Sequence, residues 1–154
     1  MMAYRCRKIL LISAVLVVIA AIFPSSAYAD QSVTAGNMTL GMIGEEEFQA
    51  GYVVVPRLPV FWESDIPWTL SIYSLDADLG ISDEADFVKP LDDLLWKPSD
   101  TDVWLPLSQD PEEVAWSFDI GSGVVYIDVI LQLDWLSDGP GDYQANILFT
   151  IEPL

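Results

Sequence analysis

Gly123–Trp135 reads GVVYIDVILQLDW, and Tyr143–Glu152, which follows after a short interval, reads YQANILFTIE. Apolar side chains occupy every second position in both stretches; in the first they are Val125, Ile127, Val129, Leu131, Leu133 and Trp135. A period of two places such residues on one face of a β-strand. The intervening Ser137–Gly141 is rich in turn-forming residues. We therefore predict that these two strands form a β-hairpin with one buried face.

Shorter segments upstream carry similar patterns. Trp68–Ile72 and Val114–Ile120 alternate in the same way, Gly51–Val55 is a β-branched run ended by Pro56, and Ser32–Leu40 is a weaker candidate. Short strands separated by turn signals about every ten residues are typical of an antiparallel sandwich. The sequence therefore predicts an all-β, Ig-like β-sandwich. Trp68, Trp116 and Trp135 each lie on the apolar face of a predicted strand, so we expect all three to be buried in the core of the sandwich.

The segment Leu75–Leu95 departs from this pattern. It holds few strand-forming residues and seven acids, which are Asp76, Asp78, Asp83, Glu84, Asp86, Asp92 and Asp93. We expect a long acidic loop inserted in the sandwich, with one helical turn over Ser82–Val88 in which Ser82 is the N-cap. Glu45–Glu47 and Asp110–Glu113 are expected to be solvated loops.

Residues 1–29 have the layout of a secretory signal peptide. Three basic residues, Arg5, Arg7 and Lys8, precede a stretch from Ile9 to Phe23 that is apolar except at Ser13, and the segment ends in a small-x-small site at Ala29. We expect a signal-peptide helix and cleavage after Ala29. The alternative is an uncleaved N-terminal anchor, although the apolar stretch is shorter than the ~20 residues that span a bilayer.

Cleavage would leave one domain, residues 30–154, with an extreme charge. The whole chain has 24 acidic and 6 basic residues and a formal charge of −18. All the acids lie after Ala29, where only Arg57, Lys89 and Lys97 are basic, so the domain would carry −21. Cys6 would leave with the leader, so no disulfide is expected. We predict a secreted protein, extracellular or at the cell surface, with no membrane span after cleavage.

Composition also excludes several functions. The chain contains no histidine, which removes Ser-His-Asp and Cys-His catalysis and imidazole metal sites. A strongly acidic domain cannot neutralise phosphates, so nucleic acid is not an expected partner. No carboxylate pair stands out as a glycosidase pair. We expect no enzymatic activity and no catalytic residues.

Two groups of residues are candidates for binding. Asp76, Asp78, Asp83 and Asp86 supply the oxygen ligands that Ca²⁺ prefers, although their spacing does not match an EF-hand loop. The alternative for these acids is a solvated surface. Trp62, Trp96 and Trp104 flank prolines or acids outside the clearest strands and could stack on sugar rings. The alternative for these tryptophans is burial in the core.

Two segments resemble known surface proteins. Pro67–Ile72, PWTLSI, resembles the first Trp-x-Leu motif of WxL-type bacterial cell-surface domains. Pro140–Pro153, PGDYQANILFTIEP, is similar to the closing strand of that family, with Phe149-Thr150-Ile151 in place of the second Trp-x-Leu. The same ending is similar to fimbrial and spore-coat-like secreted β-sandwich subunits. The resemblance implies an extracellular, surface-associated domain without enzymatic activity that contacts the cell wall.

Three hypotheses follow for function. The first is a secreted structural or adhesive subunit that acts through cell-wall or surface proteins and polysaccharide, or forms a homo-oligomer by pairing of edge strands. The second is a glycan- or peptidoglycan-binding module that uses exposed tryptophans. The third is an extracellular domain stabilised by Ca²⁺.

Overall fold

The computed structural model describes residues 12–20, 30–36, 38–40, 43–83, 87–138 and 141–154. Within these ranges the chain is almost entirely β-structure, with a single short helix, α1 (Glu45–Ala50), and one 3₁₀ turn at Leu91–Asp93. The predicted all-β class is therefore confirmed. None of the helical residues in these ranges belongs to a segment long and apolar enough to cross a membrane.

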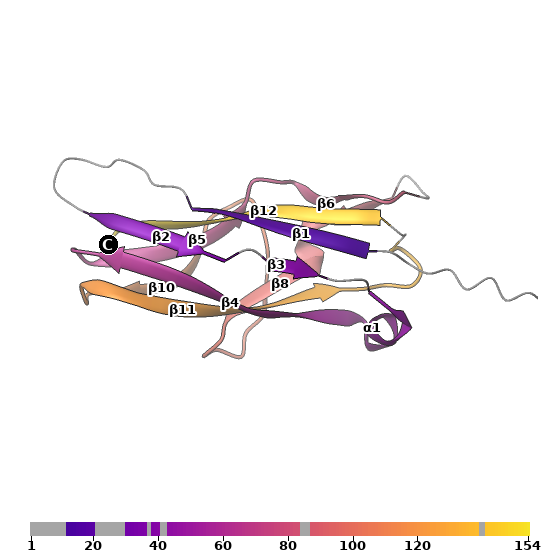
Figure 1. Ribbon diagram of the computed structural model, residues 1–154, viewed down its shortest axis with the longest axis horizontal. Coiled ribbons are helices and arrows are strands. Elements are labelled where there is room, and N and C mark those ends of the chain that lie inside the picture. Colours follow the sequence, from indigo (N-terminus) through magenta and orange to yellow (C-terminus); the bar gives the residue numbers. More distant parts are fainter. Residues whose placement is uncertain (1–11, 21–29, 37, 41–42, 84–86, 139–140) are drawn as a thin grey trace, which may run out of the picture.

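The strands form two large sheets that lie as two layers of an elongated molecule (Figure 1). Sheet A has, in spatial order, the strands β10 (Glu112–Ser117), β5 (Trp68–Ser74), β12 (Gly141–Pro153), β1 (Ile12–Ala20) and β3 (Met38–Leu40). Sheet B has β2 (Gln31–Ala35), β4 (Tyr52–Ser64), β11 (Gly121–Gln132), β8 (Leu94–Pro98) and β9 (Leu105–Pro106). A small third sheet pairs β6 (Asp78–Ile81) with β7 (Val88–Pro90).

One apolar core joins the two layers. Leu70 and Phe149 of sheet A are fully buried together with Ile127 and Val129 of sheet B. In β5 the buried and partly exposed residues alternate along the whole strand, as its sequence pattern predicts. The buried face of β11 is likewise the one that the alternation identified.

The predicted terminal hairpin is wrong. β11 pairs with β4 and β8 in sheet B, whereas β12 pairs with β5 and β1 in sheet A. The connection between the strands therefore crosses from one layer to the other. Both strands still bury one face, because they approach the same core from opposite sides. Alternation identifies the buried face of a strand but not the strand beside it.

The end of the β4 strand was also misplaced. β4 does not stop at Pro56 but continues to Ser64 through a second proline, Pro59. Its pairing with β11 shifts register between Val55 and Leu58, where it holds one residue more than its partner. A bulge of this kind leaves the extra residue out of the ladder, so a proline without an N–H group is tolerated there.

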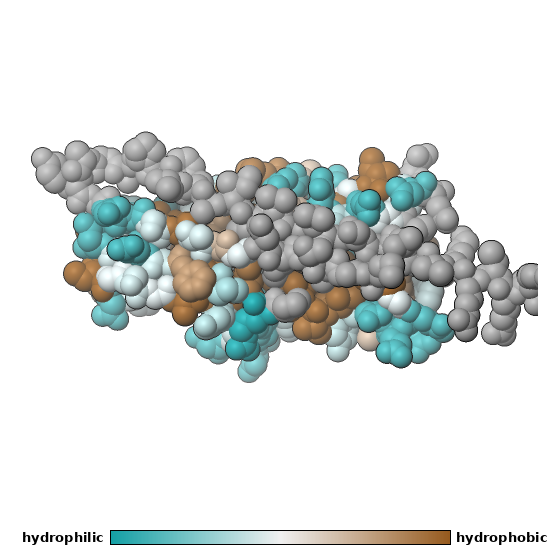
Figure 2. All heavy atoms as spheres, viewed as in Figure 1, coloured by the Kyte–Doolittle hydropathy of each residue, from teal (hydrophilic) through white to brown (hydrophobic). Residues whose placement is uncertain are grey.

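The acidic segment 75–95 is not a simple loop, because it contains β6, β7, the 3₁₀ turn and the start of β8. Of the predicted helical turn over Ser82–Val88, residues 84–86 lie outside the described part of the chain, and Val88 begins β7. The predicted loop at Glu45–Glu47 is instead the first turn of α1, where carboxylates favour the positive end of the helix dipole. Hydrophilic residues gather there, at the right-hand end of Figure 2.

Only one of the three tryptophans expected in the core is buried, namely Trp68. Trp116 and Trp135 are each 54% exposed. In β10 a bulge between Glu113 and Ala115 places Ala115 opposite Leu70, so that Trp116 lies opposite Thr69 on the outer face of sheet A. Trp135 lies beyond the end of β11 and packs on Phe48 with 4.6 Å between ring centroids.

Candidate functional site

Sheet A contains a strand that the sequence assigns to the signal peptide. Residues 12–20 form β1, a strand where we predicted a helix, and β1 runs parallel to β12 from Ile12 opposite Gly141 to Ala20 opposite Phe149 (Figure 1). Every other pair among the described strands is antiparallel. The segment ISAVLVVIA is rich in β-branched residues and apolar except at Ser13, a composition typical of parallel strands inside a sheet.

β12 depends on β1 over half of its length. Residues 147–153 of β12 pair with β5, and residues 141–149 pair with β1. Within the described sheets, residues 141–146 therefore have β1 as their one ladder partner. The last of them, Asn146, also contacts Asp76. The backbone N–H and the side-chain Nδ2 of Asn146 donate hydrogen bonds to Asp76 Oδ2, at 2.6 Å and 3.0 Å.

β3 also depends on β1. Its three residues pair with Ala14–Leu16, and β3 lies at the edge of the sheet. If residues 1–29 were removed, both the first half of β12 and the whole of β3 would lose the strand on which they pair. A bare row of N–H and C=O groups at a sheet edge recruits another strand.

The opposite edge of sheet A, formed by β10 and continued by the residues just after it, carries exposed aromatic side chains. Trp116 and Phe118 are 5.5 Å apart in an edge-to-face arrangement with an interplanar angle of 77°. Phe118 and the nearby Ile120 are more exposed than Trp116. Large apolar groups gathered at one edge of a soluble domain are characteristic of an interaction surface.

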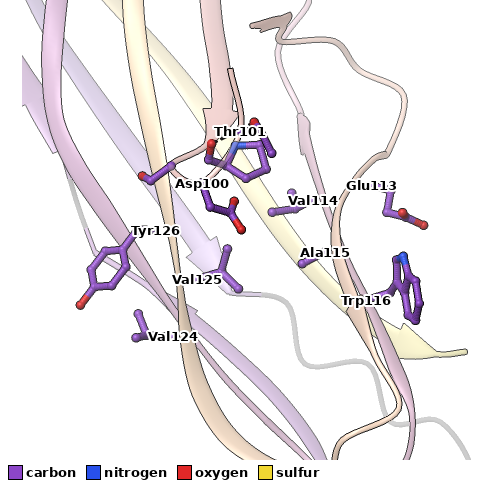
Figure 3. A pocket seen from close by; sticks show the side chains of 11 residues that line it. Asp100, Thr101, Glu113, Val114, Ala115, Trp116, Val124, Val125 and Tyr126 are labelled. Carbon is purple, nitrogen blue, oxygen red and sulfur yellow. Dashed lines mark hydrogen bonds between the residues drawn. The ribbon is translucent and has the colours of Figure 1, made fainter. Parts of the chain in front are cut away.

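A groove of about 480 Å³ lies between β10 and β11 (Figure 3). Val114 of β10 and Val125 of β11 line its middle, with the carboxylate of Asp100 beside them. The rings of Trp116 and Tyr126 lie on its two outer sides. Aromatic rings beside hydroxyl and carboxylate oxygens are a combination that suits a sugar, because the rings can stack on it and the oxygens can hydrogen-bond to it.

A buried ion pair connects the small third sheet to the segment after β11. Lys89 is fully buried, and its Nζ lies 2.8 Å from both Oδ1 and Oδ2 of Asp138 and from Oδ2 of Asp93. Asp138 Oδ2 also accepts the backbone N–H of Asp134 at 2.8 Å. Burial, together with the nearby Asp138 carboxylate, raises the pKa of the Tyr143 phenol in β12. These contacts hold the third sheet against the segment that follows β11.

Asp128, on the outer face of β11, is surrounded by donors. The Ser99 hydroxyl donates to its Oδ1 at 2.6 Å, Arg57 Nε lies 3.1 Å from the same oxygen, and Lys97 Nζ lies 3.4 Å from Oδ2. The hydrogen bond from Ser99 and the two cations lower the pKa of the carboxyl. Two of the three basic residues after Ala29, Arg57 and Lys97, thus form salt bridges with the same aspartate.

The residues proposed as calcium ligands do not converge. Asp76 is bound to Asn146, Asp78 accepts the backbone N–H of Gly80 at 3.0 Å, and Asp83 is exposed. Asp86 lies outside the described residues. In the part of the chain that the structure describes, no three acidic side chains come close enough together to hold a metal ion. The Ca²⁺ site therefore stays a prediction with no geometric support.

The three tryptophans proposed for glycan stacking do not form one platform. Trp96 is 1% exposed and offers no face to a ligand. The ring of Trp62 packs on Trp68 with 4.4 Å between centroids. Trp104 is 36% exposed, and Lys97 Nζ lies 5.4 Å from its ring centroid. The exposed tryptophans beyond this set are Trp116 and Trp135. Sequence reasoning placed both in the core, because it could not locate the bulge in β10 or the end of β11 before Trp135.

A scan against protein-family models finds no matching family, and a search of curated proteins finds no match to this chain. The resemblance to WxL-type and fimbrial domains therefore stays a prediction. The feature of the chain that bears most directly on function is the position of β1 in sheet A.

Proposed function

We propose that this protein is a secreted, non-enzymatic subunit with an Ig-like β-sandwich domain that acts at the cell surface by assembling through an edge of its sheet. One observation carries the proposal. The apolar segment that has the features of a signal peptide forms β1, and β1 covers residues 141–146 of β12. Secretion with cleavage after Ala29 would remove that cover.

Removal of β1 exposes two kinds of group. The N–H and C=O groups of β12 that pointed to β1 lose their partners, and an unpaired edge of this kind favours addition of a strand from another chain. The buried side chains of Tyr143 and Ala145, which belong to the core, would lie beside the new edge. A strand added at this edge would pair the backbone N–H and C=O groups again and would cover the side chains of Tyr143 and Ala145.

The test uses the full chain, secreted by a bacterial host, with the new N-terminus determined by mass spectrometry. The processed protein should form assemblies in electron micrographs and should sediment faster as its concentration rises. A variant with the cleavage site blocked, Ala29→Phe, should remain monomeric when extracted in detergent. A processed protein that stays a monomer at every concentration and salt level would overturn the proposal.

The groove between β10 and β11 favours a second candidate function, binding of cell-wall polysaccharide. Its support is that the ring of Trp116 lines the groove beside Glu113, while Asp100 lines it farther across. Pull-down of the secreted protein on peptidoglycan and on insoluble polysaccharides tests it, with Trp116→Ala as the variant and Trp135→Ala, equally exposed elsewhere, as its control. Binding that is lost only in Trp116→Ala supports this function, and no binding by the parent protein removes it.

A further inference from the structure

We infer that the strand that takes the place of β1 is β10 of a second copy of this chain, so that copies join edge to edge in an open-ended row. The inference rests on the proposed function and adds to it the partner, the two edges in contact and their relative direction.

Strand direction is the first argument. β10 is antiparallel to β5, and β5 is antiparallel to β12, so β10 and β12 run in the same direction within one copy. β1 runs parallel to β12 as well. A second copy in the same orientation, displaced sideways along sheet A, would therefore present its β10 to β12 in the direction that β1 has now. No rotation of the copy is needed.

Length is the second argument. β10 has six residues, and the edge of β12 that pairs with β1, residues 141–149, has nine, so β10 is long enough to cover six of those nine positions. A ladder between them would continue sheet A from one copy to the next. Residues 147–153 pair with β5 along the opposite edge of β12, so that ladder leaves the edge used by β1 free for another strand.

The exposed aromatic residues are the third argument. Trp116 lies on the outer face of β10, opposite Thr69, and the side chain of Gln144 lies on the outer face of β12, between the buried Tyr143 and Ala145. Directly opposed residues of neighbouring strands share a face. In the row, Trp116 of one copy would lie over the β12 edge of the next and lose much of its exposed area.

The contact joins two different edges, so it does not close on itself as a two-fold dimer does. Head-to-tail contacts of this kind produce filaments when the operation that relates the copies does not return to the start. Glu112 and Glu113 of β10 would approach Asp142 of β12. Like charges at the contact mean that assembly should need salt.

Cysteine cross-linking tests which edges meet. After cleavage the chain has no thiol, because its one cysteine is Cys6. Two variants, Gln144→Cys on β12 and Glu113→Cys on β10, are secreted separately, processed, mixed and treated with a short bismaleimide. Both positions are exposed and on the outer face of sheet A. The expected product is a dimer that contains one copy of each variant, and a mass difference introduced by isotope labelling identifies it.

Val54→Cys, on the exposed outer face of sheet B, is the matched control and should give no dimer with Gln144→Cys. Dimers formed within the Gln144→Cys preparation alone would overturn the inference in favour of a β12–β12 contact. Assemblies that form without any 113–144 cross-link would overturn it while leaving the proposed function intact. A processed protein that does not assemble would overturn both.

A second pair of variants separates the contact from general surface effects. Trp116→Ser and Phe61→Ser each remove an aromatic ring that is 54% exposed, the first on sheet A and the second on sheet B. Trp116→Ser should raise the protein concentration at half-assembly by about tenfold, while Phe61→Ser should leave it unchanged. Equal effects of the two substitutions would contradict the inferred contact.

Discussion

Lys89 and Asp138 form a buried ion pair in which the ammonium lies 2.8 Å from both carboxylate oxygens. Neither side chain has more than 1% of its surface exposed. The pair links β7 to the segment that carries the chain from sheet B to sheet A. It therefore fixes the crossing that brings β12 into place beside β1.

Lys89→Met should destabilise the protein by about 3–5 kcal/mol, because it leaves the Asp138 carboxylate buried without a counter-charge. Adding Asp138→Asn should recover much of the loss, since a neutral amide oxygen can still accept the Asp134 N–H. Urea denaturation of the single and double variants measures both effects. A double variant less stable than Lys89→Met would contradict this account of the pair.

Two buried tryptophans should respond differently to the same substitution. Trp68 Nε1 donates to the carbonyl of Asp119 at 3.1 Å, whereas Trp96 Nε1 has no hydrogen-bond partner among the described residues. Trp68→Phe should therefore cost about 1 kcal/mol more than Trp96→Phe, since only the first breaks a hydrogen bond. Thermal or urea unfolding of the two variants provides the comparison, and a larger loss for Trp96→Phe would count against it.

The Asp128 carboxyl should titrate below its ordinary value of 3.8. A pKa that is lower in the folded state stabilises the protein fully above the unfolded value, and this contribution is lost as the pH falls through the folded pKa. Ser99→Ala should raise the pKa of Asp128 toward 3.8, because the serine hydroxyl is its strongest stabilising contact. Carboxyl ¹³C chemical shifts measured against pH report it directly. An unchanged pKa in Ser99→Ala would show that Arg57 and Lys97 alone are sufficient to lower the pKa of Asp128.

Salt should stabilise the folded protein. A chain with a formal charge of −18 repels itself in the compact state, and at about 1 M salt the Debye length shortens to ~3 Å. The Tm measured in sodium chloride should therefore rise from low salt to that concentration. A Tm that is flat or falls over this range would show that the acids are already spaced far enough apart.

The sequence predicts the class of the fold and the buried faces of the longest strands, because alternation directly reports which side chains face the core. It does not predict neighbours: the same alternation in β11 and β12 suggested a hairpin, although the strands lie in different layers. The exposure of Trp116 depends on a bulge, and no residue type in β10 marks its position.

The sequence contains less information about the candidate site than about the fold. The apolar stretch that contains residues 12–20 fits a signal-peptide helix and a parallel strand equally well, since periodicity cannot distinguish a buried helix from a buried strand. The role of Lys89 also had no signal in the sequence. A lysine among acids is ordinarily a solvated residue, and only the distant Asp138 turns it into a buried partner.

Amide hydrogen exchange in residues 141–146 tests the central claim, that β1 covers the part of β12 that secretion exposes. Mass spectrometry would follow this segment in the uncleaved Ala29→Phe chain, in the processed protein kept dilute and monomeric at low salt, and in the assembled protein. Exchange should be slow in the uncleaved chain, fast in the processed monomer and slow again after assembly. Equally slow exchange in the processed monomer would contradict the claim, because the edge would then be closed without β1 or a second copy.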